Sequence, residues 1–268
     1  MRIVLVKFLL LIILIGISMR LIPTRQIELF QEETDRSLKT QGFLRLRNKL
    51  TSNEMRLLRK LIFDTVESDS VEFGNIDVKN NRRLDMKIPL TKFAKKLIRK
   101  LYKRLKRQFD MYDTDPILME HSTFLNFPNS DPQNWHRDVD AHDIANNGKL
   151  FTVGVALDDI QTDMGALQFL PKSHLTEDTV NQRDCNDQMT EFCGYFHDDV
   201  DFVDWTCKRG DVLVWDATLV HRSGGNRSGK MRGIYYFSVL CKTTLVPPGT
   251  THSLMDKYKK RPIRLNNI

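Results

Sequence analysis

The segment 135–138, Trp-His-Arg-Asp, carries two side chains that could bind the same metal ion. Successive side chains of an extended segment point to opposite faces, so His136 and Asp138 point to the same side. His221, far away in the sequence, could supply a third ligand. Two imidazoles and one carboxylate leave coordination positions open, which suits a non-haem Fe(II) ion that activates oxygen. A His-x-Asp pair alone is a weak signal, because short matches occur by chance and residues 129–132 predict an ordinary surface turn.

The residues around His221 indicate a second ligand-binding side chain. An apolar strand at 211–215 precedes His221, and a glycine-containing reversal after it leads to Arg232, which opens the next strand. Neighbouring antiparallel strands can place Arg232 on the same interior face as His221. A buried guanidinium is costly without an anionic partner, and arginine binds carboxylates bidentately. Arg232 could hold one end of a dicarboxylate such as 2-oxoglutarate while the other end chelates the metal, or it could form an ordinary structural ion pair.

Two helices in the first half of the chain are expected to support these strands. Thr51 and Glu54 form a capping box that predicts a helix through residues 57–62. Thr91 caps a longer predicted helix, whose inward positions at helical spacing are Phe93, Leu97, Ile98, Leu101, Leu105 and Phe109. Between them, residues 81–85 lack clear periodicity. We expect a solvated loop there, although its two arginines could contact an anionic substrate.

The second half of the chain is rich in short strands. A first short strand is predicted at 42–46, and runs rich in β-branched and aromatic residues follow at 118–127, 150–157, 166–170, 211–215 and 233–241. Helices first and short strands afterwards predict an α+β protein with a mainly β core, an antiparallel double sheet or barrel with helices packed outside. Residues from 247 onward are polar and basic, and we expect them to be peripheral.

Composition places the chain among ordinary globular proteins. It has 268 residues, of which 41% are hydrophobic and 28% are charged, with a formal net charge of +7. Much of this charge lies in residues 92–107. Few aromatic residues interleave with it, so we interpret it as a solvated helix face rather than a nucleic-acid or anionic-membrane patch, and expect no nucleic-acid partner.

The four cysteines give no metal-binding pattern. Cys185, Cys193, Cys207 and Cys241 contain no Cys-x-x-Cys pair, which argues against a zinc site. Cys185 and Cys193 flank a short polar segment and could form a disulfide in an oxidising compartment. The alternative is that both are free buried thiols.

The amino end is a targeting segment. Residues 3–19 are almost wholly apolar and are flanked by basic residues, so a single membrane span is feasible. The rival interpretation is a signal peptide with its apolar core at 8–17, followed by secretion of the cleaved protein. Bulky residues follow the segment, so we favour an uncleaved single-pass anchor at 1–22 with a lumenal or extracellular catalytic domain. The domain would then comprise a helical part at 23–116, a catalytic core at 117–245 and a basic tail at 246–268.

The chain resembles the phytanoyl-CoA dioxygenase family of Fe(II)/2-oxoglutarate oxygenases. The first motif is Trp-His-x-Asp at 135–138. The second is Leu-Asp-Asp at 157–159, with Met-Gly-Ala-Leu-Gln-Phe-Leu-Pro-Lys-Ser-His at 164–174. The third is His-x-Ser-x-x-Asn-x-Ser-x-x-x-Arg at 221–232. With Gly42-Phe43 as the family's opening, the resemblance covers residues 42–241, and the three motifs in this order are far more specific than any one of them.

The resemblance implies a double-stranded β-helix, also called a jelly roll and similar to the cupin fold. It implies that His136, Asp138 and His221 are the iron ligands at the catalytic centre. Arg232 would bind the distal carboxylate of 2-oxoglutarate, with Ser223 hydrogen-bonding nearby. His174 would be a structural turn residue, in a turn where Lys172 replaces the family's glycine. Halogenating relatives lack the carboxylate of Asp138, so its presence implies hydroxylation.

These features predict an Fe(II)- and 2-oxoglutarate-dependent dioxygenase. With O2 as second cosubstrate it would hydroxylate a small molecule or lipid and release succinate and CO2. One alternative is a protein side-chain hydroxylase of the secretory pathway, which would use Lys230 to hold 2-oxoglutarate. Another is a catalytically silent jelly roll that binds a partner through residues 175–201. The sequence leaves the substrate and the oligomeric state open.

Overall fold

A computed structural model describes residues 36–74, 82–110, 113, 115–139, 148–175, 202–241 and 253–268. The predicted anchor or signal segment at 1–22 and the pair Cys185 and Cys193 lie outside these ranges. Within these ranges, no helix combines the length and apolar character that a membrane span requires. The two cysteines that are described, Cys207 and Cys241, are buried.

Both predicted helices are confirmed. Helix α3 (Ser52–Glu67) begins with the capping box: the Thr51 side chain accepts from the Glu54 backbone N–H, and the Glu54 carboxylate accepts from the Thr51 backbone N–H. Helix α4 (Lys92–Asp110) begins after Thr91, whose Oγ1 accepts from the Ala94 backbone N–H at 3.2 Å. A short helix, α2 (Arg36–Gln41), precedes the first strand.

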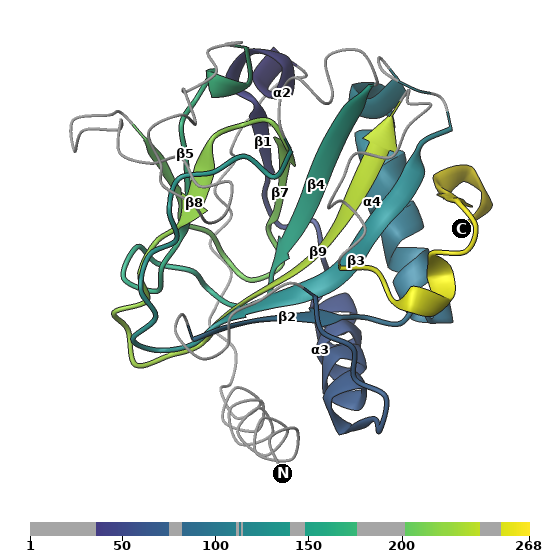
Figure 1. The fold of residues 1–268 in the computed structure, drawn as a ribbon, viewed down its shortest axis with the longest axis horizontal. Coiled ribbons are helices and arrows are strands. Elements are labelled where there is room, and N and C mark those ends of the chain that lie inside the picture. Colours follow the sequence, from purple (N-terminus) through teal and green to yellow (C-terminus); the bar gives the residue numbers. More distant parts are fainter. Residues whose placement is uncertain are drawn as a thin grey trace, which may run out of the picture.

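The strands of the described residues form two antiparallel sheets (Figure 1). The large sheet has seven strands in the order β1-β7-β4-β9-β3-β10, with β2 also paired to β3. Its strands are β1 (Phe43–Leu46), β2 (Arg83–Lys87), β3 (Ile117–Asn126), β4 (Lys149–Ala156), β7 (Val212–Asp216), β9 (Arg232–Cys241) and β10 (Ile263–Arg264). The small sheet has the order β6-β5-β8, with β6 (Val203–Trp205), β5 (Leu167–Phe169) and β8 (His221–Ser223).

Each face of the large sheet packs against a different partner. The outer face packs on α3 and α4 through a core that includes Leu58, Leu101, Phe151 and Phe237 (Figure 1). The inner face meets the small sheet through a second cluster that includes Phe169, Trp205, Trp215 and Ile234. The predicted double sheet with helices outside is therefore confirmed, and the space between the sheets is where a site can be enclosed.

Two expectations about local structure were wrong. Residues 83–87, expected within or beside a solvated loop, form β2, and all five are buried. Polar and apolar residues do alternate there, but the polar residues lie on the face opposite the helices, so the strand lacks the usual apolar inner face. The carboxyl end is not merely peripheral: β10 extends the large sheet, and Leu265 and Ile268 join the core beside α4.

Candidate metal centre

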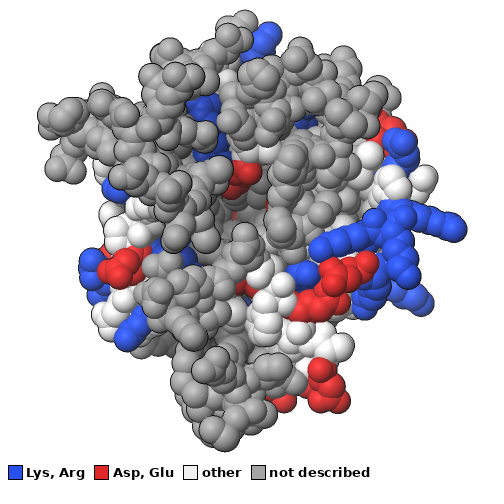
Figure 2. All heavy atoms as spheres, viewed as in Figure 1, with Lys and Arg blue, Asp and Glu red and all other residues white. Residues whose placement is uncertain are grey.

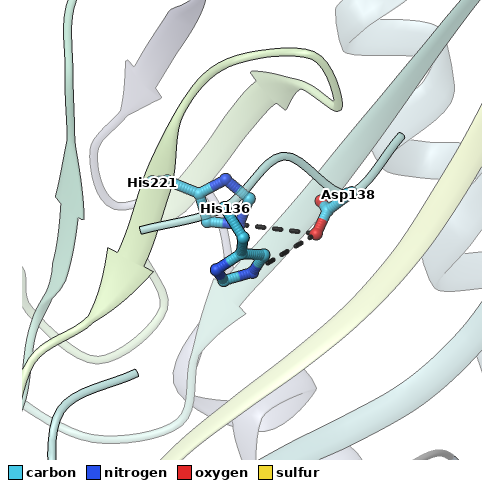
Figure 3. Close-up of side chains that lie close together, drawn as sticks. All are labelled: His136, Asp138 and His221. Carbon is cyan, nitrogen blue, oxygen red and sulfur yellow. Dashed lines mark ion pairs between the residues drawn. The ribbon is translucent and has the colours of Figure 1, made fainter. Parts of the chain in front are cut away.

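The structure brings together the three side chains predicted to bind a metal (Figure 3). Oδ1 of Asp138 lies 3.8 Å from Nε2 of His136 and 3.5 Å from Nε2 of His221. One ligand atom from each residue lies within 4.8 Å of the other two, close enough for a single ion to contact all three. His221 is buried, and the other two side chains keep partial exposure, so the centre can be reached from one side.

Backbone pairing places the two imidazoles next to each other. His136 and His221 exchange two backbone hydrogen bonds of 2.9 Å, although 85 residues of sequence separate them. Their ring centroids are 4.5 Å apart. The backbone N–H of Asp138 donates to the Ala217 carbonyl at 2.9 Å, which fixes the third side chain beside the turn that leads into β8. The centre therefore depends on two distant segments meeting at the edge of the small sheet.

Hydrogen bonds orient each side chain for coordination. Nδ1 of His136 donates to the Asn134 carbonyl at 2.9 Å, and Nδ1 of His221 donates to the Leu219 carbonyl at 2.9 Å. Both Nε2 atoms are then left with the lone pair that a metal ion requires. Nε1 of Trp215 donates to Oδ2 of Asp138 at 3.2 Å, which leaves Oδ1 toward the imidazoles.

Neighbouring motif residues support the centre without joining it. Nη1 of Arg137 donates to the Thr218 carbonyl at 2.7 Å, away from the triad, as expected for a residue between two inward-facing ones. His174 bonds the Lys39 carbonyl through Nε2 at 3.0 Å, and burial lowers the pKa of its imidazole. Oγ of Ser173 accepts from the Val220 backbone N–H at 2.8 Å, immediately before His221. The 164–174 motif thus positions the strand that carries the third ligand.

Arg232 is completely buried at the start of β9 and has no carboxylate partner among the described residues. Its Nη1 donates to the Gly165 carbonyl at 2.6 Å, but Nε and Nη2 have no hydrogen-bond partner. Burial lowers the pKa of Arg232 to about 9, and the positive charge of Arg83 adds to this shift. The ordinary structural ion pair considered for Arg232 is therefore absent from the described part of the chain.

Two further donor groups lie in register beside Arg232. Arg83 on β2 is opposite Asn126 on β3, which is opposite Arg232 on β9. All three side chains are buried, and Nε of Arg83 and Nδ2 of Asn126 also lack partners. Unpaired buried donors are costly and together call for an acceptor, so this row has the chemistry of a site for an anion with several oxygens.

Gly165 and Ser223 lie beside this row of donors. Oγ of Ser223 donates to the Gly165 carbonyl at 3.4 Å, the same oxygen that Arg232 contacts. Gly165 has a φ of +72°, and an added Cβ would lie 2.4 Å from the Gly224 carbonyl oxygen and 2.9 Å from Nδ2 of Asn126. Only glycine fits this close approach. Ser223 therefore lies in the predicted neighbourhood of Arg232.

The residues proposed for other roles lie elsewhere. Lys230 is exposed, whereas Arg232 is buried beside the interior. Asn226 of the 221–232 motif is buried, and its Nδ2 donates to the carbonyls of Asn126 and Lys230. Asn226 therefore holds the reversal between β8 and β9.

The sequence did not identify Asn126, Gly165 or Trp215 as residues of the site. It placed Arg83 in a loop that could contact an anionic substrate, whereas the structure places it on a strand in register with Arg232. The signal for Arg83 was present in the polar-apolar alternation of residues 83–87. No comparable signal marks Trp215, because its apolar strand reads as ordinary core until the fold shows its indole against Asp138.

Comparison with known proteins agrees with the motifs. A model of the phytanoyl-CoA dioxygenase (PhyH) family matches residues 38–234. A Danio rerio protein, "Phytanoyl-CoA dioxygenase domain-containing protein 1", is 33% identical over 98 residues, which are 35% of this chain and 34% of that protein. The match thus spans about one third of the relative's length.

Solved structures share the fold at low sequence identity. The non-heme alpha-ketoglutarate-dependent carbocyclase SnoK from nogalamycin biosynthesis is 17% identical, with a TM-score of 0.64 over 80% of this chain and 85% of that chain. HygX from Streptomyces hygroscopicus, solved with nickel, 2-oxoglutarate and hygromycin B, is 16% identical, with a TM-score of 0.56 over 81% of this chain and 89% of that chain. These likenesses confirm the predicted jelly-roll fold.

Proposed function

The chain belongs to the phytanoyl-CoA dioxygenase family of Fe(II)- and 2-oxoglutarate-dependent oxygenases, and from this premise we propose that it hydroxylates a small-molecule substrate at the centre formed by His136, Asp138 and His221. Their preset Nε2 and Oδ1 atoms offer three ligands of the types that suit Fe(II). Three protein ligands leave positions for 2-oxoglutarate and O2.

The unpaired guanidinium of Arg232 carries this proposal. A fully buried cation with two unpartnered N–H groups fits the distal carboxylate of 2-oxoglutarate, which can accept both at once. Arg83 and Asn126 would add donors from the neighbouring strands, and Ser223 would bound the pocket through the shared Gly165 carbonyl. Lys230 is exposed, which disfavours the alternative in which lysine holds the cosubstrate.

When bound, Fe(II) and 2-oxoglutarate supply, with O2, the oxidative chemistry that releases succinate and CO2 and hydroxylates a substrate C–H bond. The chain's own part is positioning. The carbonyls of Asn134 and Leu219 hold the imidazole orientation, Trp215 holds the Asp138 carboxylate, and the donor row containing Arg232 fixes the cosubstrate's far end. The apolar cluster between the sheets, including Phe169 and Trp215, keeps water away from the buried side of His221.

A small-molecule substrate is also in keeping with the structural neighbours. Structures similar to this chain contain hygromycin B in HygX and nogalamycin RO in SnoN. Their low identity relates them to this chain through the fold, so the substrate here must be read from this chain's own interior residues. The family relationship and the intact triad both disfavour a catalytically silent jelly roll.

A binding experiment with matched variants tests the proposal. The full chain loaded anaerobically with Fe(II) is titrated with 2-oxoglutarate, together with Arg232→Gln and Lys230→Gln. We expect Arg232→Gln to weaken 2-oxoglutarate binding at least about tenfold, because a hydrogen-bonded charged partner is lost, and Lys230→Gln to bind as the unmodified protein does. Equal weakening by both variants, or none by Arg232→Gln, would contradict the proposed role of Arg232.

A further inference from the structure

The inner face of the large sheet carries a polar row that ends at the metal centre. Glu120 on β3 is opposite Ser238 on β9, Ser238 is opposite Thr152 on β4, and Thr152 is opposite Trp215 on β7. Side chains that are directly opposite on neighbouring strands share one face and lie in contact. Trp215 donates to Asp138, so the row connects Glu120 with the carboxylate of the triad.

The pairing of β3 with β9 places Glu120 on this inner face. Residues 120–126 of β3 pair without interruption with residues 232–238 of β9, so Glu120 lies on the same face as Ser122 and Asn126. The register shift between Leu118 and Glu120 affects only the start of the strand and leaves Met119 as the extra residue. Met119 packs with Val139, the residue after Asp138, which places this part of β3 beside the metal centre.

Glu120 has only one hydrogen-bond partner among the described residues. Oγ of Ser238 donates to Oε2 of Glu120. Oγ1 of Thr152 lies 3.2 Å from Oγ of Ser238, so the three side chains form one hydrogen-bonded chain. No lysine or arginine of the described ranges forms an ion pair with Glu120. The residue as a whole is half-buried. A carboxyl group is therefore presented between the sheets with one oxygen available to a ligand.

The second carboxyl group on this inner face shows the contrast. Asp85 on β2 accepts hydrogen bonds from three hydroxyl groups, those of Ser122, Tyr236 and Ser253. These donors occupy both of its oxygens, so Asp85 is a structural residue. Burial raises the pKa of Glu120 to about 8, and the negative charges of Asp138 and Asp85 add to this shift. Glu120 thus lacks the additional hydrogen bonds that offset the burial of the Asp85 carboxyl group. A ligand that donates a hydrogen bond or carries a positive charge would offset the burial of Glu120.

We infer that Glu120 is a specificity-determining residue that binds a hydrogen-bond-donating group of the substrate, a protonated amine or a hydroxyl. The substrate is then a polar molecule that bears such a group near the carbon to be oxidised. An unsubstituted acyl chain has no group that could donate a hydrogen bond to Glu120. A cationic amine fits best, because the described residues offer Glu120 no counter-charge. This inference rests on the proposed function and names the substrate class of the same site.

Three six-carbon probes test this inference. Hexylamine, hexanol and hexanoate share one apolar chain and differ in the end group that Glu120 would meet. Their binding is measured by ligand-observed NMR on the metal-free full chain and on the chain loaded anaerobically with Fe(II) and 2-oxoglutarate. In the loaded chain, where 2-oxoglutarate occupies the donors around Arg232, we expect hexylamine and hexanol to bind at least about tenfold more tightly than hexanoate, the difference typical of a hydrogen bond to a charged group against a like-charge contact. Hexanoate can bind Arg232 in the metal-free chain, so only hexylamine and hexanol are compared there.

The variants assign the preference to one carboxyl group. Glu120→Gln should lose at least about tenfold in hexylamine binding while hexanol binding changes less than about threefold. Glu67→Gln, the same change at an exposed position at the end of α3, should leave all three probes unaffected. If Glu120→Gln fails to fold, Glu120→Asp keeps the charge and should keep the order of the probes.

The outcomes separate this inference from the proposed function. Equal or undetectable binding of the three probes to the loaded unmodified chain would overturn the role of Glu120, as would hexylamine binding that survives in folded Glu120→Gln in either sample. Failure to bind Fe(II) or 2-oxoglutarate counts against the proposed function instead, and the metal-free sample reports on Glu120 independently of it.

Discussion

At the residue scale, the site is built from buried charged groups that have no ion-pair partner of opposite charge among the described residues. Arg232 and Arg83 are buried without carboxylate partners in the described part of the chain, and Glu120 is turned inward without a cation. Sites of this kind are expensive to maintain in the absence of ligand. Their arrangement is therefore explained by what they bind, with a diacid at the arginine end and a donor-bearing substrate at the glutamate end.

Gly165 gives a prediction at this scale. Replacing it with alanine would put a Cβ within 2.4 Å of the Gly224 carbonyl oxygen at a φ of +72°, so the backbone must shift and move the carbonyl that Arg232 contacts. We expect 2-oxoglutarate binding to weaken at least about tenfold and the free energy of unfolding to fall by about 1–3 kcal/mol. Titration and urea unfolding measure the two effects.

Gly229 is the matched control for that substitution. An added Cβ there meets nothing within 4 Å, and the residue is exposed in the reversal between β8 and β9. Gly229→Ala should therefore leave both 2-oxoglutarate binding and unfolding unchanged. If the two alanine variants behave alike, the crowding at Gly165 is not what shapes the pocket.

Short motifs made the triad and Arg232 predictable from the sequence. His136 and Asp138 are two residues apart on one face, and Arg232 follows His221 by a fixed spacing through a glycine-containing reversal. Glu120 was not predictable in the same way. It alternates regularly with Ser122 and Asn126 on β3, but a single acidic residue in a strand forms no motif, and only the pairing of β3 with β9 shows that its face is the inner one.

At the scale of elements, β2 shows why one strand was missed. Leu84 and Met86 enter the helix-side core while Arg83 and Asp85 lie on the opposite, inner face, and Lys87 forms ion pairs with Glu72 and Asp256 at the end of the strand. A strand whose inner face carries functional polar groups has no apolar inner stripe, so its pattern resembles that of a solvated segment. The three-residue strands β6 and β8 are too short to give a periodic signal.

Helix α4 carries an uncompensated stripe of positive charge. Its exposed basic residues are Lys92, Lys95, Lys96, Arg99, Lys103, Arg104 and Arg107. Figure 2 shows Lys and Arg side chains gathered on the side of the molecule where α4 and the carboxyl-terminal segment lie in Figure 1. The described residues supply no ion pair to this stripe. Like charges three and four residues apart repel one another and lower the stability of the helix.

Lys92→Glu should therefore stabilise the protein. The new carboxylate would lie in the first turn of α4, where the helix dipole favours negative charge, and it would attract Lys95 and Lys96. We expect the free energy of unfolding to rise by about 0.5–1 kcal/mol at low ionic strength and the gain to shrink in high salt. Arg107→Glu, in the last turn of α4, should raise the free energy of unfolding less, because the helix dipole disfavours negative charge there. A loss of stability, or a gain that is independent of salt, would refute this electrostatic explanation.

At the scale of the whole molecule, the fold serves to bring distant segments to one place. The helices cover the outer face of the large sheet, which leaves the inner face free to carry the polar rows that contain Arg232 and Glu120 (Figure 1). The overall architecture was predictable because helix caps and β-rich runs are local signals. Which strands would be neighbours was not, because pairing of segments such as β2 with β3 is decided by the complete core.

The most direct test of the central claim is an anaerobic Fe(II) titration of the full chain and of His136→Ala, Asp138→Ala and His221→Ala. We predict one Fe(II) per chain for the unmodified protein, a charge-transfer absorption band when 2-oxoglutarate is added, and at least about tenfold weaker Fe(II) binding in each variant. Fe(II) binding that is the same in the unmodified protein and in all three variants, or no binding in any of them, would contradict an iron centre at these residues.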